Sequence, residues 1–162
     1  MPYTLHHHGA VDGVTGSCHQ LLLADGRSIL VDCGLFQGAE TSADGGAAGQ
    51  PEIGFPVADI QALVLTHVHI DHVGRIPHLL AAGFRGPIIS SQASAALLPL
   101  VLEDALKVGF TRDETLIRRF LGEIRKQLVP LPYKAWQTVI DGATRVGTNS
   151  LAASMASSPI TR

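Results

Sequence analysis

The feature that most constrains this chain is a short apolar run that leads directly into a cluster of metal-binding residue types. Residues 62–65 (Ala-Leu-Val-Leu) have the length and composition of a buried strand, and residues 66–72 (Thr-His-Val-His-Ile-Asp-His) follow at once. Ionisable side chains directly after a buried strand lie where the chain leaves the sheet, and functional residues concentrate in such connections. We therefore expect a sheet whose core strand ends in this segment.

The neighbouring segments predict an α/β fold. Apolar runs on both sides of Asp25-Gly26 indicate a β-hairpin over residues 17–32. A helix over residues 75–82, closed by Gly83, and a strand over residues 87–89 are expected after the His-rich segment. The order of strand, helix and strand indicates an α/β layer arrangement.

Two longer helices and two irregular segments complete the prediction. Residues 91–108 are expected to be helical, with Pro99 kinking or dividing the helix. A second helix is expected to begin at Thr111, which has capping-box spacing to Glu114, and to stop at the prolines that start at Pro130. Residues 38–54 are predicted to be an exposed loop. Thirteen of the last 21 residues are Gly, Ala, Ser or Thr, which predicts a poorly ordered tail.

Composition excludes several classes of protein. The chain has 162 residues, 46% of them hydrophobic, and a formal net charge of −2, which is typical of one globular domain and not of collagen-like or highly charged disordered chains. Its two cysteines cannot form a disulfide framework, and the chain shows no secretory signal or membrane-length apolar run. We therefore expect a cytoplasmic protein without a membrane partner. Nucleic-acid binding would need a local basic patch.

The His-rich segment has the chemistry of a metal site. In extended backbone His67, His69 and Asp71 share one side, and a turn at the strand end can bring His72 to join them. Imidazole nitrogen and carboxylate oxygen suit zinc, manganese or iron. Four donors could serve one ion, but their crowding favours two adjacent ions that share a bridging hydroxide, which is the nucleophile of hydrolytic chemistry. A His-rich surface loop without ligands is the alternative.

The pattern His67-x-His69-x-Asp71-His72 resembles the signature of the metallo-β-lactamase fold. Residues 13–18 (Gly-Val-Thr-Gly-Ser-Cys) and 30–38 (Leu-Val-Asp-Cys-Gly-Leu-Phe-Gln-Gly) resemble the RNA-processing branch of that family. This branch contains the β-CASP nucleases, among them ribonuclease J-like enzymes and the cleavage-and-polyadenylation endonuclease. The resemblance implies an α/β fold of the αββα sandwich type, of which this chain supplies only the amino-terminal half.

The resemblance also implies roles for single residues. His67 and His69 would ligate one divalent ion and Asp71 and His72 a second, with zinc as the expected metal and with Asp71 and His72 as the catalytic residues. Asp32 matches the first motif of the family, in which a carboxylate supports the metal centre from behind its ligands. A simple strand-end turn residue is the equally weighted alternative for Asp32.

The resemblance runs from about Gly9 to Trp136, and part of the family's metal site has no counterpart in this sequence. A complete site needs a further His, a bridging Asp and a later His, yet the sequence has no histidine after His78. The β-CASP cap, which contributes RNA binding in the family, is missing as well. We therefore expect residues 1–141 to be a partial metallo-β-lactamase domain and residues 142–162 to be a tail from truncation or a frameshift.

Three functions remain open at this point. The first is a metal-dependent RNA nuclease, present as an incomplete chain that is inactive alone. The second is a thioester or lactone hydrolase of the same fold. The third is a non-catalytic metal-binding fragment that needs a partner or a second copy to complete its core.

Other polar and thiol groups have less specific patterns. The three histidines at positions 6–8 are expected to be incidental, with a ligand role near the site as the alternative, and His19 and His78 are expected to be structural. Cys18 and Cys33 are expected in the core. A helix face with Arg118, Arg119, Arg125 and Lys126 is weak evidence for RNA.

Overall fold

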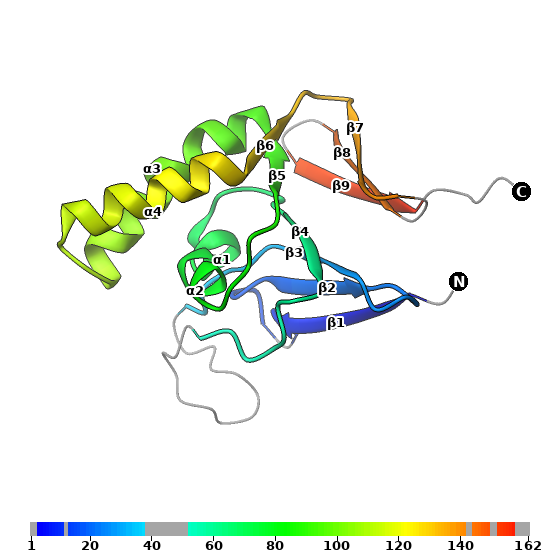
Figure 1. Ribbon diagram of the computed structural model, residues 1–162, viewed down its shortest axis with the longest axis horizontal. Coiled ribbons are helices and arrows are strands. Elements are labelled where there is room, and N and C mark those ends of the chain that lie inside the picture. Colours follow the sequence, from blue (N-terminus) through cyan, green and yellow to red (C-terminus); the bar gives the residue numbers. More distant parts are fainter. Residues whose placement is uncertain (1–2, 12, 38–51, 142–143, 150–151, 158–162) are drawn as a thin grey trace, which may run out of the picture.

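The computed structural model describes residues 3–11, 13–37, 52–141, 144–149 and 152–157. Within these residues a six-stranded sheet has the order β1-β2-β3-β4-β5-β6 (Figure 1). Its strands are β1 Thr4–Gly9, β2 Cys18–Leu22, β3 Ser28–Val31, β4 Ile60–Val64, β5 Ile88–Ser91 and β6 Leu128–Leu131. The first three strands pair antiparallel, and β3 to β6 pair parallel. The predicted hairpin over residues 17–32 and the predicted strands at residues 62–65 and 87–89 are confirmed.

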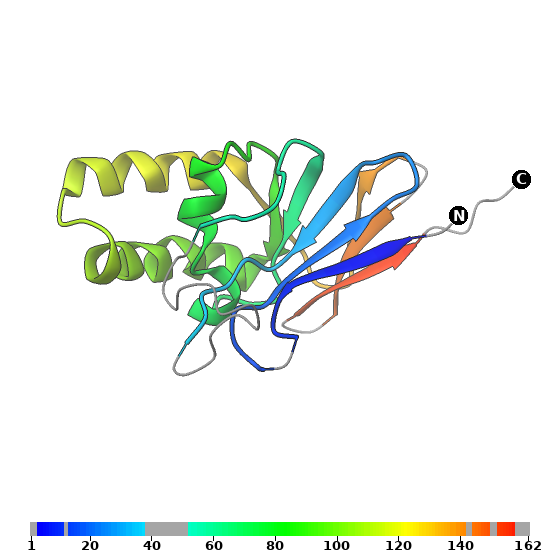
Figure 2. The same cartoon turned by 90° about the horizontal axis from the view of Figure 1, so that it is seen from below.

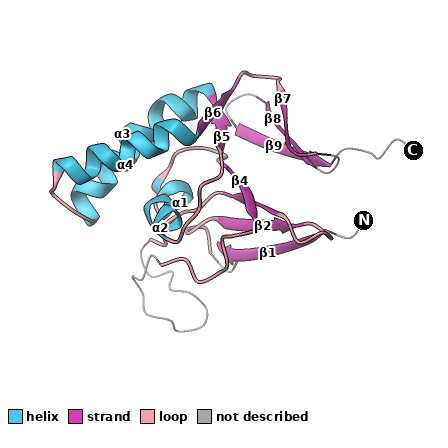
Figure 3. Ribbon diagram, viewed as in Figure 1, coloured by secondary structure: helices cyan, strands magenta, loops and turns pink. Residues whose placement is uncertain are grey.

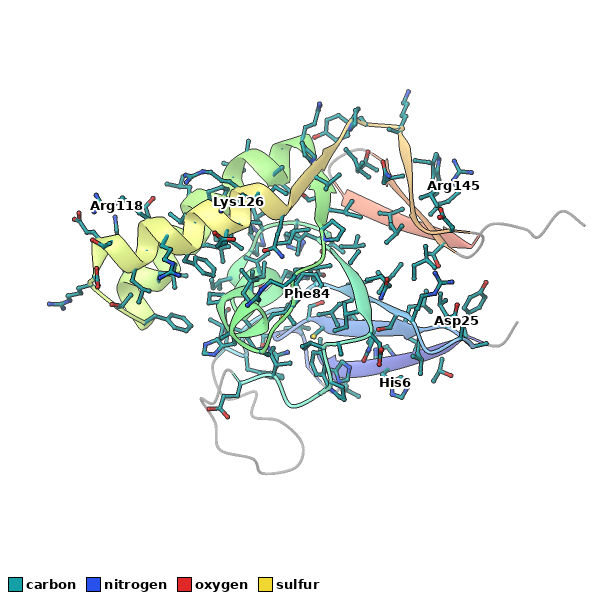
Figure 4. The ribbon with its side chains drawn as sticks, in the orientation of Figure 1. His6, Asp25, Phe84, Arg118, Lys126 and Arg145 are labelled. Atoms are coloured by element: carbon teal, nitrogen blue, oxygen red, sulfur yellow. The ribbon has the colours of Figure 1, made fainter. Side chains whose placement is uncertain are left out.

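Helices cover one face of this sheet (Figure 3). They are α1 Ile70–Val73, α2 Ile76–Ala81, α3 Gln92–Gly109 and α4 Glu114–Gln127. Side chains such as Leu30, Leu63 and Ile88 form the larger core cluster with apolar residues of the helices. Phe84, which is buried in this cluster, lies in the interior next to α1 and α2 (Figure 4). Burial of these apolar faces is the main source of stability.

A second sheet lies against the other face of the first (Figure 2). It consists of β7 Trp136–Ile140, β8 Thr144–Asn149 and β9 Ala152–Ser157, paired antiparallel. Residues that alternate with those of the larger cluster, such as Ile29 and Val64, pack in a second cluster with Ile140 and Val146. The described residues therefore form α, β and β layers, which confirms the predicted α/β fold class.

The carboxyl-terminal part differs from its prediction. Composition predicts a poorly ordered segment, but residues 144–149 and 152–157 form β8 and β9. Thr144, Val146 and Thr148 are buried at every second position, and the Thr148 hydroxyl donates to the carbonyl of Pro132 (2.6 Å). Small residues can therefore build strands where a neighbouring sheet supplies the apolar contacts. The domain boundary at residue 141 stays a prediction.

The structure also defines three details of the two longer helices. Asp113 caps α4 in place of Thr111, because its Oδ1 accepts from the backbone N–H groups of Thr115 (2.8 Å) and Leu116 (3.2 Å). After α4 the chain continues directly into β6, and α3 passes through Pro99 undivided. The predicted loop lies outside the described residues over 38–51. Among the described helices, none combines the length and the apolar character of a membrane span.

Candidate metal centre

The His-rich segment lies where two parallel strands end together. Asp32 follows β3 and Thr66 follows β4 after one residue, so the parallel pairing brings both to the same edge of the sheet. The helix α1 then begins at Ile70, which turns the chain and carries Asp71 and His72 back toward the strand ends (Figure 1). The expected turn after the strand is thus a short helix.

Asp32 is the buried hub of this edge. Its side chain is almost fully buried, and its Oδ1 accepts the backbone N–H of Thr66 at 2.9 Å. Its Oδ2 lies 2.8 Å from the Thr66 hydroxyl, 2.8 Å from His72 Nδ1 and 3.2 Å from the Ser17 hydroxyl. Asp32 also has a φ of 59°, a left-handed conformation that Asp tolerates better than most residues. The carboxylate therefore both turns the chain and contacts a predicted ligand.

Because an ionised carboxylate can only accept hydrogen bonds, Asp32 determines the direction of its neighbours' hydrogen bonds. His72 must donate from Nδ1, so its Nε2 carries the lone pair. The Thr66 hydroxyl donates to Asp32 and can accept from His67 Nδ1, which lies 3.0 Å from it. His67 then also presents an unprotonated Nε2. A single carboxylate thus presents the Nε2 lone pairs of two imidazoles, in the way that carboxylates behind metal-ligating histidines orient those rings.

The four predicted ligands come together in two pairs. His67 Nε2 lies 3.2 Å from His69 Nδ1, and His72 Nε2 lies 3.6 Å from the Asp71 carboxylate. The rings of His67 and His72 are 3.9 Å apart between centroids, which connects the pairs. Two nitrogen ligands of a tetrahedral zinc ion stand about 3.3 Å apart, so the first pair is near ligand spacing. Across the described residues, no three or more His, Cys, Asp or Glu side chains are arranged to hold one ion.

Electrostatics keep His67 in the form that binds metals. Burial, together with the nearby His72 and His69 side chains, lowers the pKa of His67 below its usual value. A neutral imidazole carries the free lone pair that a metal needs. The donor set therefore fits borderline divalent ions by chemistry, as two pairs of ligands.

Backbone contacts hold the ligand-bearing segment against the residues that follow β3. The N–H of Cys33 donates to the carbonyl of His72 (2.7 Å), and the N–H of Arg75 donates back to the carbonyl of Cys33 (2.9 Å). The buried Arg75 side chain adds a hydrogen bond from Nε to the carbonyl of Gly34 (2.6 Å). A Cβ atom on Gly34 would overlap the backbone of Asp71, so only glycine permits this approach.

Sequence reasoning did not identify the two hydroxyls that contact Asp32. The position of Thr66 between the apolar run and His67 could have indicated a role in the site. Ser17 is 15 residues away from Asp32 in sequence, and no local pattern connects the two. His78 lies outside the cluster, and its ring packs on Phe110 with centroids 4.8 Å apart. Cys18 and Cys33 are free thiols in the core, as predicted.

The described residues thus combine layers of helix, sheet and sheet with His and Asp side chains gathered at the strand ends. The chain matches the Metallo-beta-lactamase superfamily over residues 13–147, and it belongs to that superfamily. The match includes all four predicted ligands and Asp32, and it extends into β8.

Relatives of the chain include a ribonuclease, a transcription termination factor and a cleavage and polyadenylation specificity factor subunit, which confirms the resemblance to that branch. The chain is 43% identical to Ribonuclease TTHA0252 of Thermus thermophilus over 149 residues, which are 89% of this chain and 30% of that protein. It is 32% identical over 130 residues to Transcription termination factor FttA of Cenarchaeum symbiosum, covering 77% of this chain and 19% of that protein. The chain thus spans less than a third of these relatives.

A solved structure supports the fold independently. The metallo-beta-lactamase fold protein YhfI of Bacillus subtilis aligns with a TM-score of 0.50 and 19% identity, covering 98% of this chain and 59% of YhfI. At this identity the likeness concerns the fold alone. The predicted αββα fold, of which this chain supplies only a part, therefore agrees with this solved structure.

Proposed function

We propose that this chain carries the first metal-binding motif of an RNA phosphodiesterase. The observation that supports this most is the Asp32 hub, which contacts Nδ1 of His72 directly and Nδ1 of His67 through the Thr66 hydroxyl. The chain shares this strand-end motif with a superfamily of hydrolases, and its named relatives include a ribonuclease. RNA is therefore the proposed substrate, and the thioester or lactone alternative is less favoured.

In this proposal His67 and His69 hold one divalent ion, and Asp71 and His72 hold a second. Zinc is the proposed metal, because imidazole nitrogen and carboxylate oxygen are its usual ligands. When bound, such ions lower the pKa of a water molecule and stabilise negative charge on the phosphate oxygens. Asp32 and Thr66 position the imidazoles, and Asp71 and His72 are the groups of this chain proposed to act in the reaction.

The chain alone is proposed to be nearly inactive. Two protein ligands per ion are fewer than the three that a catalytic zinc site has. In the described residues no group of three such ligands forms, which supports weak binding by the isolated chain. The missing ligands would come from a part of the protein that corresponds to the rest of the ribonuclease relative.

Two measurements test this proposal. Calorimetric titration of the 162-residue chain with Zn²⁺ should show weak binding that His69→Ala reduces and that the exposed His6→Ala leaves unchanged. A chimaera in which this chain replaces the matching part of Ribonuclease TTHA0252 should cleave single-stranded RNA and lose that activity on His69→Ala. A folded, zinc-loaded chimaera that hydrolyses a thioester and not RNA would overturn the RNA assignment.

A further inference from the structure

Two histidines outside the candidate metal centre face each other across neighbouring strands. His7 lies on the edge strand β1 and His19 on β2, directly opposite in the register. Their Nδ1 atoms are 2.8 Å apart, and the ring centroids are 4.9 Å apart at an interplanar angle of 78°. The two Nδ1 atoms therefore face each other at hydrogen-bond distance across the two strands.

The Asp32 hub also determines the hydrogen-bonding direction of this pair. The Ser17 hydroxyl donates to Asp32 at 3.2 Å, so its oxygen can accept from His19 Nε2, which lies 3.4 Å away. His19 then carries its proton on Nε2 and presents a lone pair on Nδ1 toward His7. The Nε2–H contact to an oxygen is the arrangement in which a metal-ligating imidazole is usually held.

The spacing of the two nitrogens is close to that of a chelating pair. Nitrogen ligands at the usual zinc distance stand about 2.9 to 3.4 Å apart for bond angles between 90° and 109°. The two Nδ1 atoms, which are 2.8 Å apart, need to separate by only a few tenths of an ångström. His7 is exposed and His19 half-buried, so the remaining positions on an ion would be open to water.

The protonation state of His19 suits the same role. Burial and the neighbouring His7 lower the pKa of His19 below its usual value, with Asp32 as the opposing influence and His72 and His8 adding to the decrease. A neutral ring at neutral pH needs to lose no proton before it binds an ion. His7 only has to move its proton from Nδ1 to its other ring nitrogen.

We propose that His7 and His19 form a second, surface-exposed binding site for a borderline divalent ion such as Ni²⁺, Cu²⁺ or Zn²⁺. Two protein ligands with water in the other positions make this site weak and rapidly exchanging, and imidazole nitrogen favours these metals over Mg²⁺ or Ca²⁺. The site does not depend on the proposed function, because it shares no ligand with the centre at residues 67–72. An ion bound there would hold His19, and through Ser17 it would steady the Asp32 carboxylate.

Titration with Ni²⁺ in a variant without the other centre tests the proposal. The 162-residue chain with His67→Ala, His69→Ala and Asp71→Ala, which breaks both proposed ligand pairs, should still bind about one equivalent of Ni²⁺ by calorimetry. Adding His7→Gln should remove that equivalent. The matched control is His6→Gln, the adjacent exposed histidine of β1, whose ring stacks on His8 with centroids 6.4 Å apart (Figure 4). This control should leave the equivalent in place.

A second measurement protects the test against loss of folding in the variants. In the unsubstituted chain, substoichiometric Cu²⁺ should broaden the ring NMR signals of His7 and His19 more than those of His6 and His8. The proposal is overturned when the triple variant at His67, His69 and Asp71 folds by circular dichroism but binds no Ni²⁺. Equal loss of binding in His6→Gln and His7→Gln also overturns it, because the run of three histidines would then act as a flexible chelator.

Discussion

The two sides of the candidate metal centre are built very differently. On the inner side, Asp32 is 1% exposed and has four hydrogen-bond donors around its two oxygens. On the outer side, His69 is exposed and contacts another proposed ligand, His67, in place of the hub. The difference shows that this part of the chain fixes the orientation of His72 and His67 from the buried side, whereas His69 is held by no buried carboxylate.

Removal of the Asp32 carboxylate, on the inner side, should have the largest effect on stability. Asp32→Ala leaves buried donors from Thr66, Ser17 and His72 without an acceptor, which should lower the free energy of unfolding by about 3–5 kcal/mol. Urea denaturation measures this loss. Asp32→Asn is the matched control, because Asn also tolerates a left-handed φ and retains one acceptor oxygen. A similar loss in both variants would show that the charge, and not the hydrogen-bond acceptors, stabilises the hub.

Gly34→Ala should come next, since its Cβ would overlap the backbone at Asp71. The ligand-bearing segment would have to move away from the strand, at a cost of roughly 3 kcal/mol. The control is Gly122→Ala in α4, where a Cβ meets nothing within 4 Å. That change should stabilise the protein by up to about 1 kcal/mol, because alanine favours the helix. Equal melting temperatures for the two variants would contradict the close approach of Gly34 to Asp71.

Thr66→Val should have a smaller effect on stability and a specific effect on metal binding. Valine keeps the shape of threonine but removes the hydroxyl between Asp32 and His67. We expect a loss of about 1–2 kcal/mol in unfolding free energy and of about 10–100-fold in zinc affinity. Thr115→Val, at an exposed position near the start of α4, should leave zinc affinity unchanged. Unchanged zinc affinity in Thr66→Val would remove Thr66 from the site.

The pH dependence of stability should show the smallest effect. Because the folded-state pKa of His67 lies below its unfolded value of about 6.5, the unfolded chain binds more protons as the pH falls through 6.5. The stability of the metal-free protein should therefore decrease from pH 7.5 to 5.5. The lowered pKa values of His8, His19 and His78 act in the same direction. His67→Gln should reduce the slope of melting temperature against pH, and an unchanged slope would contradict this assignment.

Much of the fold was predictable because its signals are local. The Asp25-Gly26 turn sets the hairpin, and Gly83, with a φ of 106°, closes α2. The strands at residues 144–157 were not predictable from hydrophobicity, since they contain mostly small residues and are stabilised by contacts with β7 and the first sheet. Local spacing likewise suggested Thr111 as a cap, whereas the side chain of Asp113 makes the capping hydrogen bonds.

In the candidate site, too, the features with local sequence signals were predictable and those that depend on distant contacts were not. The spacing of His67, His69, Asp71 and His72 was enough to predict that these residues gather, because a strand followed by a turn brings them together. The roles of Ser17 and Thr66 depend on the parallel pairing of β3 with β4 and on the approach of β2, which join residues far apart in sequence. The contact between His7 and His19 depends on the register of an edge strand, which no local pattern specifies.

The most direct test of this account is the protonation pattern of the histidine rings. Long-range ¹H–¹⁵N NMR spectra of the metal-free chain at pH 7.5 distinguish a proton on Nδ1 from a proton on Nε2. The account predicts Nδ1–H for both His67 and His72, with unprotonated Nε2 atoms, and a shift toward the Nε2–H form in Asp32→Asn. Rings of His67 and His72 that carry their protons on Nε2 in the unsubstituted chain would contradict the role of Asp32 as the hub of the site.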